Sequence, residues 1–189
     1  MSIAQNVESA LLERRALLSG HFRLSSGLHS DRFIQKFRIL EDPRLVELVA
    51  EPIARAFAAD DPTLVVSAAV GGIILGYEVA RQLGTKSIFV EKEHGAPALR
   101  RNFELNENDR VVIVEDVVTT GGSVHEVMNV VRERGARILG VGIIVRRGDV
   151  DLGAPTRVLL DIPMQSFAPQ DCPQCAAGTP VTDPGSRRS

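Results

Sequence analysis

The chain has 189 residues, of which 44% are hydrophobic and 24% are charged, with a formal net charge of -2. A chain of this size and composition forms one compact unit with a sizeable core. The small net charge provides no global field toward nucleic acid or anionic lipid, so an anionic ligand must be bound locally. No apolar stretch is long enough to span a bilayer, and charged residues interrupt the first thirty positions where a signal peptide is apolar. We therefore expect a cytoplasmic protein with no membrane and no nucleic-acid partner.

The N-terminal region predicts two helices separated by a small strand-rich segment. Apolar residues recur at helical spacing over residues 3–18, which indicates an amphipathic helix. Over residues 19–40 they recur closer to every second position, around a turn at Ser25-Ser26-Gly27. We expect this segment to form a hood or flap. Pro43 then suits the first turn of a helix over residues 44–59.

From residue 63 onward, apolar runs alternate with helical patterns. Strands are predicted at 63–67, 86–91, 110–115, 137–145 and 157–161, and helices at 72–83 and 123–134. The runs do not alternate with polar residues, as is typical of strands covered on both faces. The pattern predicts an α/β fold with a doubly wound, mostly parallel sheet, whose ligands bind at the carboxyl ends of the strands. We expect residues 1–162 to form a single domain and residues 163–189 to form an irregular tail that contains Pro and Gly.

The segment from Val111 to Ser123 combines an apolar strand, two acids and a run of small residues. Backbone N–H groups at the start of a helix, left open by Gly121 and Gly122 and assisted by hydroxyls, suit a phosphate. Glu115 and Asp116 would repel that phosphate, so they must face hydrogen-bond donors such as vicinal ribose hydroxyls, or a metal ion bound to them. The segment therefore predicts a sugar-phosphate site. The alternative is a tight turn whose acids are solvated.

Other phosphate-binding motifs do not occur in the chain. No Walker-type Gly-Lys-Ser element follows a strand, and no GxGxxG opens a helix. A nucleoside triphosphatase and a Rossmann dehydrogenase are both disfavoured.

Three segments resemble those of a known family. Residues 112–123 resemble the ribose-5-phosphate-binding signature of type I phosphoribosyltransferases. Residues 20–30 look like the hood segment of orotate phosphoribosyltransferases, and residues 67–74 look like their pyrophosphate loop. The similarity extends over about residues 10 to 165. The resemblance implies a type I phosphoribosyltransferase-like fold with a small N-terminal hood.

The resemblance also implies an activity. Such enzymes are glycosyltransferases that convert orotate and phosphoribosyl pyrophosphate to orotidine 5'-monophosphate and pyrophosphate in pyrimidine biosynthesis. It implies Mg2+ as cofactor and a homodimer. We expect Mg2+ to be held mainly by the pyrophosphate and ribose hydroxyls, without direct side-chain ligands, and through water to Glu115 and Asp116.

The site residues follow from matching positions. The implied catalytic residues are Glu115, Asp116, Lys92 and His94. The implied substrate-binding residues are Ala69, Val70, Gly71, Gly72, Val117, Val118, Thr119, Thr120, Gly121, Gly122, Ser123, Arg147, Ser26 and Gly27.

The segment around Lys92 and His94 departs from the family pattern. In the family, this segment is a mobile lid that brings basic residues to the pyrophosphate. Here it is shorter, carries Glu91 where the family commonly has arginine, and lacks a second lysine. Arg100 and Arg101 are candidates to supply the missing charge, and a charged surface loop is the alternative.

Two further positions bear on base specificity. Ser25 replaces the lysine that the family commonly carries before Ser-Gly. Arg147 aligns with the arginine that meets the orotate carboxylate, while Arg146 replaces the acid beside it. A guanidinium can bind a planar carboxylate through two hydrogen bonds. The alternative is a pair of solvated charges at the end of a strand.

The two cysteines form a single CxxC motif, Cys172 to Cys175, in the tail. A structural zinc site normally has four ligands, and no histidine is near in sequence, so we expect idle thiols; zinc or redox chemistry is the alternative. His21 and His29 flank the hood turn, and we expect structural roles for both.

Three functions remain open. The first is an orotate phosphoribosyltransferase, the second a phosphoribosyltransferase for another base, and the third a non-catalytic regulator that binds phosphoribosyl pyrophosphate. No helix-turn-helix extension or basic stripe supports the third.

Overall fold

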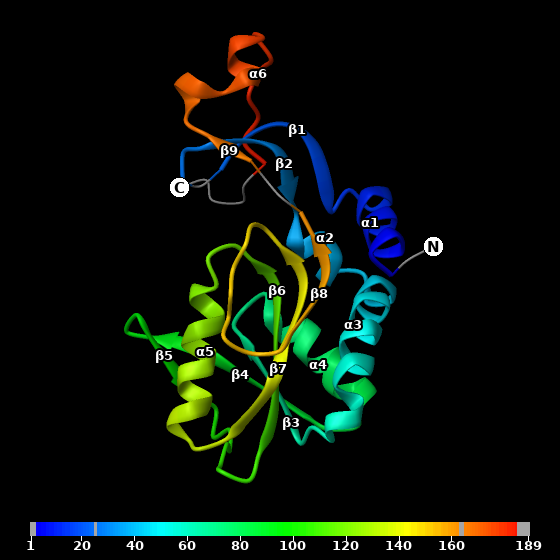
Figure 1. The fold of residues 1–189 in the computed structure, drawn as a ribbon, viewed down its shortest axis with the longest axis vertical. Helices are drawn as coiled ribbons and strands as arrows, with labels where there is room; N and C mark the ends of the chain where they lie inside the picture. The colour runs from blue at the N-terminus through cyan, green and yellow to red at the C-terminus, as the bar shows by residue number, and fades with distance from the viewer. Residues whose placement is uncertain (1–2, 25, 163–164, 185–189) are drawn as a thin grey trace.

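A six-stranded sheet forms the centre of the molecule in the computed structural model, which describes residues 3–24, 26–162 and 165–184 (Figure 1). Its strands lie in the order β5-β4-β3-β6-β7-β8, and all neighbours are parallel except the antiparallel pair β4 and β5. The bounds are β3 Leu64–Ala68, β4 Lys86–Glu93, β5 Ala96–Leu99, β6 Arg110–Val118, β7 Arg137–Arg146 and β8 Thr156–Asp161. The prediction of a mostly parallel α/β sheet is confirmed.

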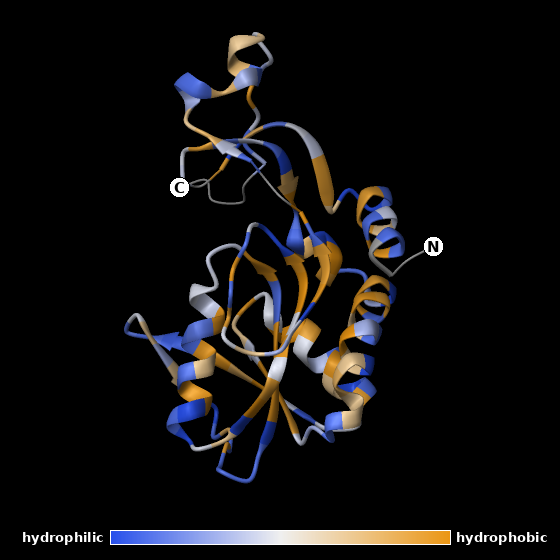
Figure 2. Ribbon diagram, viewed as in Figure 1, coloured by the Kyte–Doolittle hydropathy of each residue, from blue (hydrophilic) through white to orange (hydrophobic). Residues whose placement is uncertain are grey.

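Helices cover both faces of this sheet. The first face packs against α1 (Ile3–Glu13), α3 (Pro43–Phe57) and α4 (Gly72–Leu83), and the second against α5 (Gly122–Glu133). In β6, Val112 and Val114 belong to the first cluster, and Val111 and Ile113 to the second. Because successive side chains of a strand point to opposite faces, a strand buried on both sides must be apolar at every position. Figure 2 shows the resulting apolar strands at the centre of the molecule.

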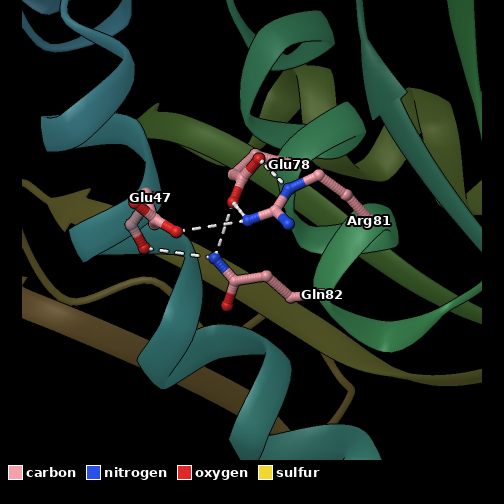
Figure 3. A network of polar contacts seen from close by, with 4 residues as sticks. All are labelled: Glu47, Glu78, Arg81 and Gln82. Carbon is pink, nitrogen blue, oxygen red and sulfur yellow. Dashed lines mark hydrogen bonds and ion pairs between the residues drawn. The ribbon is translucent and has the colours of Figure 1, made fainter.

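The helices α3 and α4 are also joined by a polar network (Figure 3). Arg81 contacts Glu78 on its own helix and Glu47 on α3, where the distance from Nη2 to Oε1 is 3.3 Å. The side-chain amide of Gln82 donates to the backbone carbonyl of Glu47 at 3.2 Å and to Glu78 at 2.8 Å. These contacts link the two helices, and the exposed ion pair between Arg81 and Glu47 contributes little to stability by itself.

A second sheet forms the hood. It contains β1 (Leu17–Arg23), β2 (His29–Ile34) and β9 (Ser166–Phe167), in that order. The helix predicted over residues 3–18 ends instead at Glu13, because Leu17 and Leu18 pair with β2. The short helix α2 (Lys36–Leu40) leads from the hood to α3.

The C-terminal tail packs on this hood. After β9 it forms a 3-10 turn (Pro169–Asp171) and α6 (Pro173–Ala176); Figure 1 shows this segment, coloured orange to red, beside β1 and β2. A parallel bridge joins Thr182 to Phe22 of β1. The tail thus supplies one strand of the hood, although its sequence predicted no regular element. The two-residue β9 is too short to show periodicity.

A further 3-10 turn, Ala58–Asp60, follows α3.

The described part of the chain contains no helix that is long and apolar enough to cross a membrane.

Candidate active site

The two predicted acids lie within β6, close to its carboxyl end, because the strand runs on to Val118 rather than ending at residue 115. β6 lies between β3 and β7, and both carboxylates are buried: Glu115 is 6% exposed and Asp116 is 1% exposed. Burial, together with the neighbouring negative charge of Asp116, raises the pKa of Glu115 from 4.5 to about 8. Glu115 is therefore protonated at neutral pH in the absence of a ligand, and the acid pair carries one proton.

Asp116 has two partners that fix its carboxylate. The backbone N–H of Val117 donates to Oδ1 at 2.7 Å, and the ammonium of Lys36 lies 3.1 Å from Oδ2 and 3.4 Å from Oδ1. Lys36 is the first residue of α2, and its side chain is 39% exposed. A cation from the hood segment is thereby brought to the acid pair of the central sheet.

The loop after β6 forms the wall of a cavity. Gly121 adopts a φ of 79°, a conformation that favours glycine, and α5 begins at the next residue. The cavity has a volume of about 280 Å³ and is lined by Lys92, Glu115, Val117, Val118, Thr119, Thr120, Gly121, Gly122, Ser123, Val124 and Glu126. The structure therefore brings together the glycine-hydroxyl loop, one predicted acid and one predicted lysine. A helix N-terminus with small side chains suits a phosphate group.

The predicted pyrophosphate loop, residues 69–72, lies between β3 and α4. A Cβ atom on Gly71 would lie 2.1 Å from Oδ2 of Asp116 and 2.6 Å from the ammonium of Lys36. The backbone must therefore approach the carboxylate closely, which only glycine allows. The N–H of Ala69 already donates to the carbonyl of Val90 at 2.8 Å, so Ala69 does not offer this group to an anion. Val70 is 71% exposed at the rim of the loop.

The predicted lid is a hairpin formed by β4 and β5. His94 and Gly95 form its two-residue turn with φ values of 50° and 86°, as a type I′ turn requires. Lys92 lines the cavity and contacts Glu126 of α5 at 2.9 Å. His94 lies at the tip of the hairpin and does not line the cavity.

Arg100 and Arg101 both pair with acids of the hairpin. Arg101 donates to Glu91 at 2.8 and 3.1 Å, and Arg100 lies 3.3 Å from Glu93. Glu91 and Glu93 both belong to β4, so each arginine is already matched by a carboxylate of the hairpin. The hypothesis that they replace the missing lid charge therefore requires these pairs to open.

The two arginines that follow the apolar run of β7 differ in their contacts. Arg146 forms two hydrogen bonds with Asp161 of β8, at 2.8 and 2.6 Å. Arg147 donates its backbone N–H to Val118 at 2.8 Å, which places it beside the loop after β6. Its buried Nε has no hydrogen-bond partner within the described part of the chain, and burial lowers the pKa of its guanidinium. An arginine with an unsatisfied buried donor is suited to bind a carboxylate ligand.

Comparisons with known proteins decide the family. The model of the phosphoribosyl transferase domain matches residues 38–152. This chain belongs to the phosphoribosyltransferase family. Its relatives include an orotate phosphoribosyltransferase from Pelotomaculum thermopropionicum, 49% identical over 175 residues that cover 92% of each chain. Another from Thermotoga maritima is 44% identical over 183 residues, 96% of this chain and 98% of that one.

A solved structure agrees with these relatives. The crystal structure of orotate phosphoribosyltransferase from Aeropyrum pernix is 25% identical, has a TM-score of 0.69, and covers 85% of this chain and 94% of that one. The resemblance inferred from the sequence motifs, and the type I phosphoribosyltransferase-like fold, are confirmed.

Other predicted residues of this phosphoribosyltransferase lie in the hood. Gly27 adopts a φ of 83° in the turn between β1 and β2, and its N–H donates to Leu24 at 2.9 Å. Ser26 is exposed beside it, and neither residue lines the cavity. Ser25 lies outside the described residues.

Sequence reasoning missed Lys36. Nothing in the sequence around Lys36 signals a functional role, because its partner Asp116 is 80 positions away. Only the fold of the hood onto the central sheet brings the two together. Lys36 thus supplies a cation beside the acid pair of this phosphoribosyltransferase.

Proposed function

We propose that this protein is an orotate phosphoribosyltransferase, which forms orotidine 5'-monophosphate and pyrophosphate from orotate and phosphoribosyl pyrophosphate in pyrimidine biosynthesis. One observation carries the proposal at the site. A buried acid pair directly precedes a glycine-hydroxyl loop that lines a cavity of about 280 Å³. The relatives that match more than nine-tenths of the chain carry the same name.

The reaction moves charge, which the proposed site residues can accommodate. A bond forms between a ring nitrogen of orotate and the anomeric carbon of ribose, while the bond from that carbon to pyrophosphate breaks. The anomeric carbon becomes cationic on the way. We expect Glu115 and Asp116 to accept hydrogen bonds from the ribose hydroxyls near this charge, and residues 119–123 to bind the 5'-phosphate. Catalysis then comes mainly from positioning and electrostatics.

We expect cationic residues to bind the carboxylate of orotate and the phosphate groups of phosphoribosyl pyrophosphate. The Arg147 guanidinium, with its unsatisfied buried Nε, binds the orotate carboxylate. Lys92, on the cavity wall, exchanges its contact with Glu126 for the phosphate groups of phosphoribosyl pyrophosphate. His94 at the hairpin tip contributes only if the hairpin moves on binding.

The residues present fit a magnesium ion held mostly by the substrate. Mg2+ prefers oxygen ligands and retains several waters. Asp116 is already matched by Lys36, and Glu115 retains a proton to about pH 8, so the pair suits contact through ribose hydroxyls or water. The ion would supply neutralisation of the pyrophosphate charge.

The assembly state and location belong to the same proposal. We propose a homodimer and a cytoplasmic location, in keeping with the family resemblance. Analytical ultracentrifugation of the purified protein at micromolar concentration tests the homodimer, and a single sedimenting species of monomer mass would remove it.

The decisive experiment is an assay of orotate consumption, followed by absorbance, with phosphoribosyl pyrophosphate and Mg2+. Parallel reactions contain uracil, nicotinate, adenine or hypoxanthine in place of orotate. Asp116→Asn serves as the matched negative control. Turnover of orotate alone supports the proposal, whereas turnover of another base assigns a different specificity. Calorimetric binding of phosphoribosyl pyrophosphate without turnover of any base would make the protein a regulator.

A further inference from the structure

Four side chains that are far apart in sequence meet between the hood and the tail. They are His21 of β1, His29 of β2, and Cys172 and Cys175 at α6. Their ligand atoms all lie within 4.8 Å of one another, and neither cysteine forms a disulfide. From the sequence we expect idle thiols, because no histidine is near the CxxC motif in the chain. The fold nevertheless brings two histidines that are distant in sequence to the CxxC motif.

The distances within this cluster are close to those between the ligands of a tetrahedral zinc site. His21 Nε2 lies 2.9 Å from His29 Nδ1 and 3.4 Å from the sulfur of Cys172. The sulfur of Cys175 lies 3.2 Å from His29 Nδ1 and 3.6 Å from His21 Nε2. Four ligands around a zinc ion, with bonds of about 2.0 Å to nitrogen and 2.3 Å to sulfur, are separated from each other by about 3.3 to 3.8 Å. Two of the four distances, 3.4 and 3.6 Å, fall in this range. The other two, 2.9 and 3.2 Å, both involve His29 Nδ1 and are shorter by at most about half an ångström, so a small outward shift of His29 gives the spacing of a two-cysteine, two-histidine site.

The tautomer of His21 is set by a contact outside the cluster. Its Nδ1 lies 2.8 Å from the backbone carbonyl of Thr179. A carbonyl can only accept, so Nδ1 carries the proton and Nε2 directs its lone pair into the cluster. Metal-bound histidines commonly donate their other ring N–H to a carbonyl in this way.

The described part of the tail, residues 165–184, has almost no buried side chains. Among residues 165–184, which the structure describes, Cys172 is the only buried residue. The tail also forms hydrogen bonds with the hood, such as those from the N–H and hydroxyl of Thr182 to the carbonyl of His21 at 2.8 and 2.9 Å. A segment without an apolar core is commonly stabilised by a disulfide or a metal.

We propose that His21, His29, Cys172 and Cys175 bind a structural zinc ion that fastens the C-terminal tail to the hood. All four coordination positions are taken by side chains, which is typical of a structural rather than a catalytic zinc. The site shares no residue with the cavity beside β6, so it stands independently of the proposed transferase activity. An absence of bound zinc would therefore leave the proposed transferase activity untouched, and an absence of orotate turnover would leave the proposed zinc site untouched.

Metal content is the first test. The full chain, with any affinity tag removed, is purified with a reductant and without chelators, incubated with ZnCl2 and desalted. Mass spectrometry of the metal should then find about one zinc per chain. Cys172→Ser and Cys175→Ser should each lower this content at least tenfold. His125→Gln, which changes a histidine outside the cluster, serves as the matched control and should retain the metal.

A spectroscopic test on the wild-type protein does not depend on the folding of the variants. Replacing zinc by cobalt should give the visible absorption of tetrahedral cobalt together with thiolate-to-cobalt charge-transfer bands. Removing the metal with a chelator should speed proteolytic cleavage within residues 165–184 before the central sheet is cut.

Three outcomes would overturn the proposal. The first is a wild-type protein with less than about a tenth of a zinc ion per chain after incubation with ZnCl2. The second is zinc that persists when both cysteines are replaced, because the metal would then lie elsewhere. The third is a Cys172–Cys175 disulfide in the protein purified with reductant, because those sulfurs would not be available as ligands.

Discussion

Replacing Glu115 by glutamine should change how the stability of the protein depends on pH. The folded state raises the pKa of Glu115 from 4.5 to about 8, mainly by burial and then by the charge of Asp116. Between these two values the folded state holds a proton that the unfolded state has lost. The free energy of unfolding of the wild type must therefore fall as pH rises, by about 1.4 kcal/mol per pH unit for one proton. Below pH 4.5 this contribution is fully present, and it is lost as pH rises to about 8.

Glutamine keeps the shape of the protonated side chain but does not ionise. Glu115→Gln should therefore remove this slope and exceed the wild type in unfolding free energy by about 3 kcal/mol at pH 7. Urea unfolding at pH 5.5, 6.5 and 7.5 measures the effect. The chain has no Trp and one Tyr, so far-UV circular dichroism is the suitable signal.

Glu126→Gln is the matched control. Glu126 lines the same cavity, but its side chain is 37% exposed and paired with Lys92, so removing its charge should not alter the slope between pH 5.5 and 7.5. Parallel stability curves for the wild type and Glu115→Gln would refute the reasoning. They would mean that Glu115 is ionised in the folded protein despite its burial.

Three further substitutions test the site. Asp116→Asn should lower kcat/KM for phosphoribosyl pyrophosphate by about 10- to 100-fold through lost charged hydrogen bonds, with an unchanged circular dichroism spectrum; unchanged kinetics would remove this assignment. Arg147→Ala should raise the KM for orotate by about 10- to 100-fold and change the KM for phosphoribosyl pyrophosphate far less. The control Arg146→Ala removes a contact to strand β8 and should change either KM less than about threefold. Equal effects of Arg147→Ala on the KM of both substrates would argue against binding of the orotate carboxylate by Arg147. Gly71→Ala places a Cβ 2.1 Å from the Asp116 carboxylate, so calorimetry should find phosphoribosyl pyrophosphate bound at least about tenfold more weakly, and wild-type affinity would contradict the close approach.

The central sheet could be predicted from the sequence because its signals are local. The helix predicted over residues 72–83 is α4, with both ends correct, and the run from Val111 onward is β6. Continuous apolar strands between helices leave few other arrangements, and the order of strand, acids and small residues marks the phosphate loop within one stretch of chain.

The remaining features depend on contacts between distant segments. His21 and Cys172 are separated by 151 positions, and Lys36 and Asp116 by 80, so no window of sequence contains either pair. A strand over residues 86–91 is predicted, but its partner β5 is not, because β5 has only four residues, too few to show alternation between its faces. The division between a domain ending at residue 162 and a separate tail stays a prediction.

The acid pair is hard to explain by folding alone. A carboxyl group that is 6% exposed beside another that is 1% exposed lowers stability at neutral pH, and apolar residues at these two positions of β6 would avoid that cost. The only cation that the described residues place on the pair is Lys36, which neutralises one charge. Gly71 leaves room for the carboxylate where any other residue would displace it. These features together keep two acids beside a loop that suits an anion. Binding a ribose phosphate requires this arrangement, whereas the stability of the fold does not.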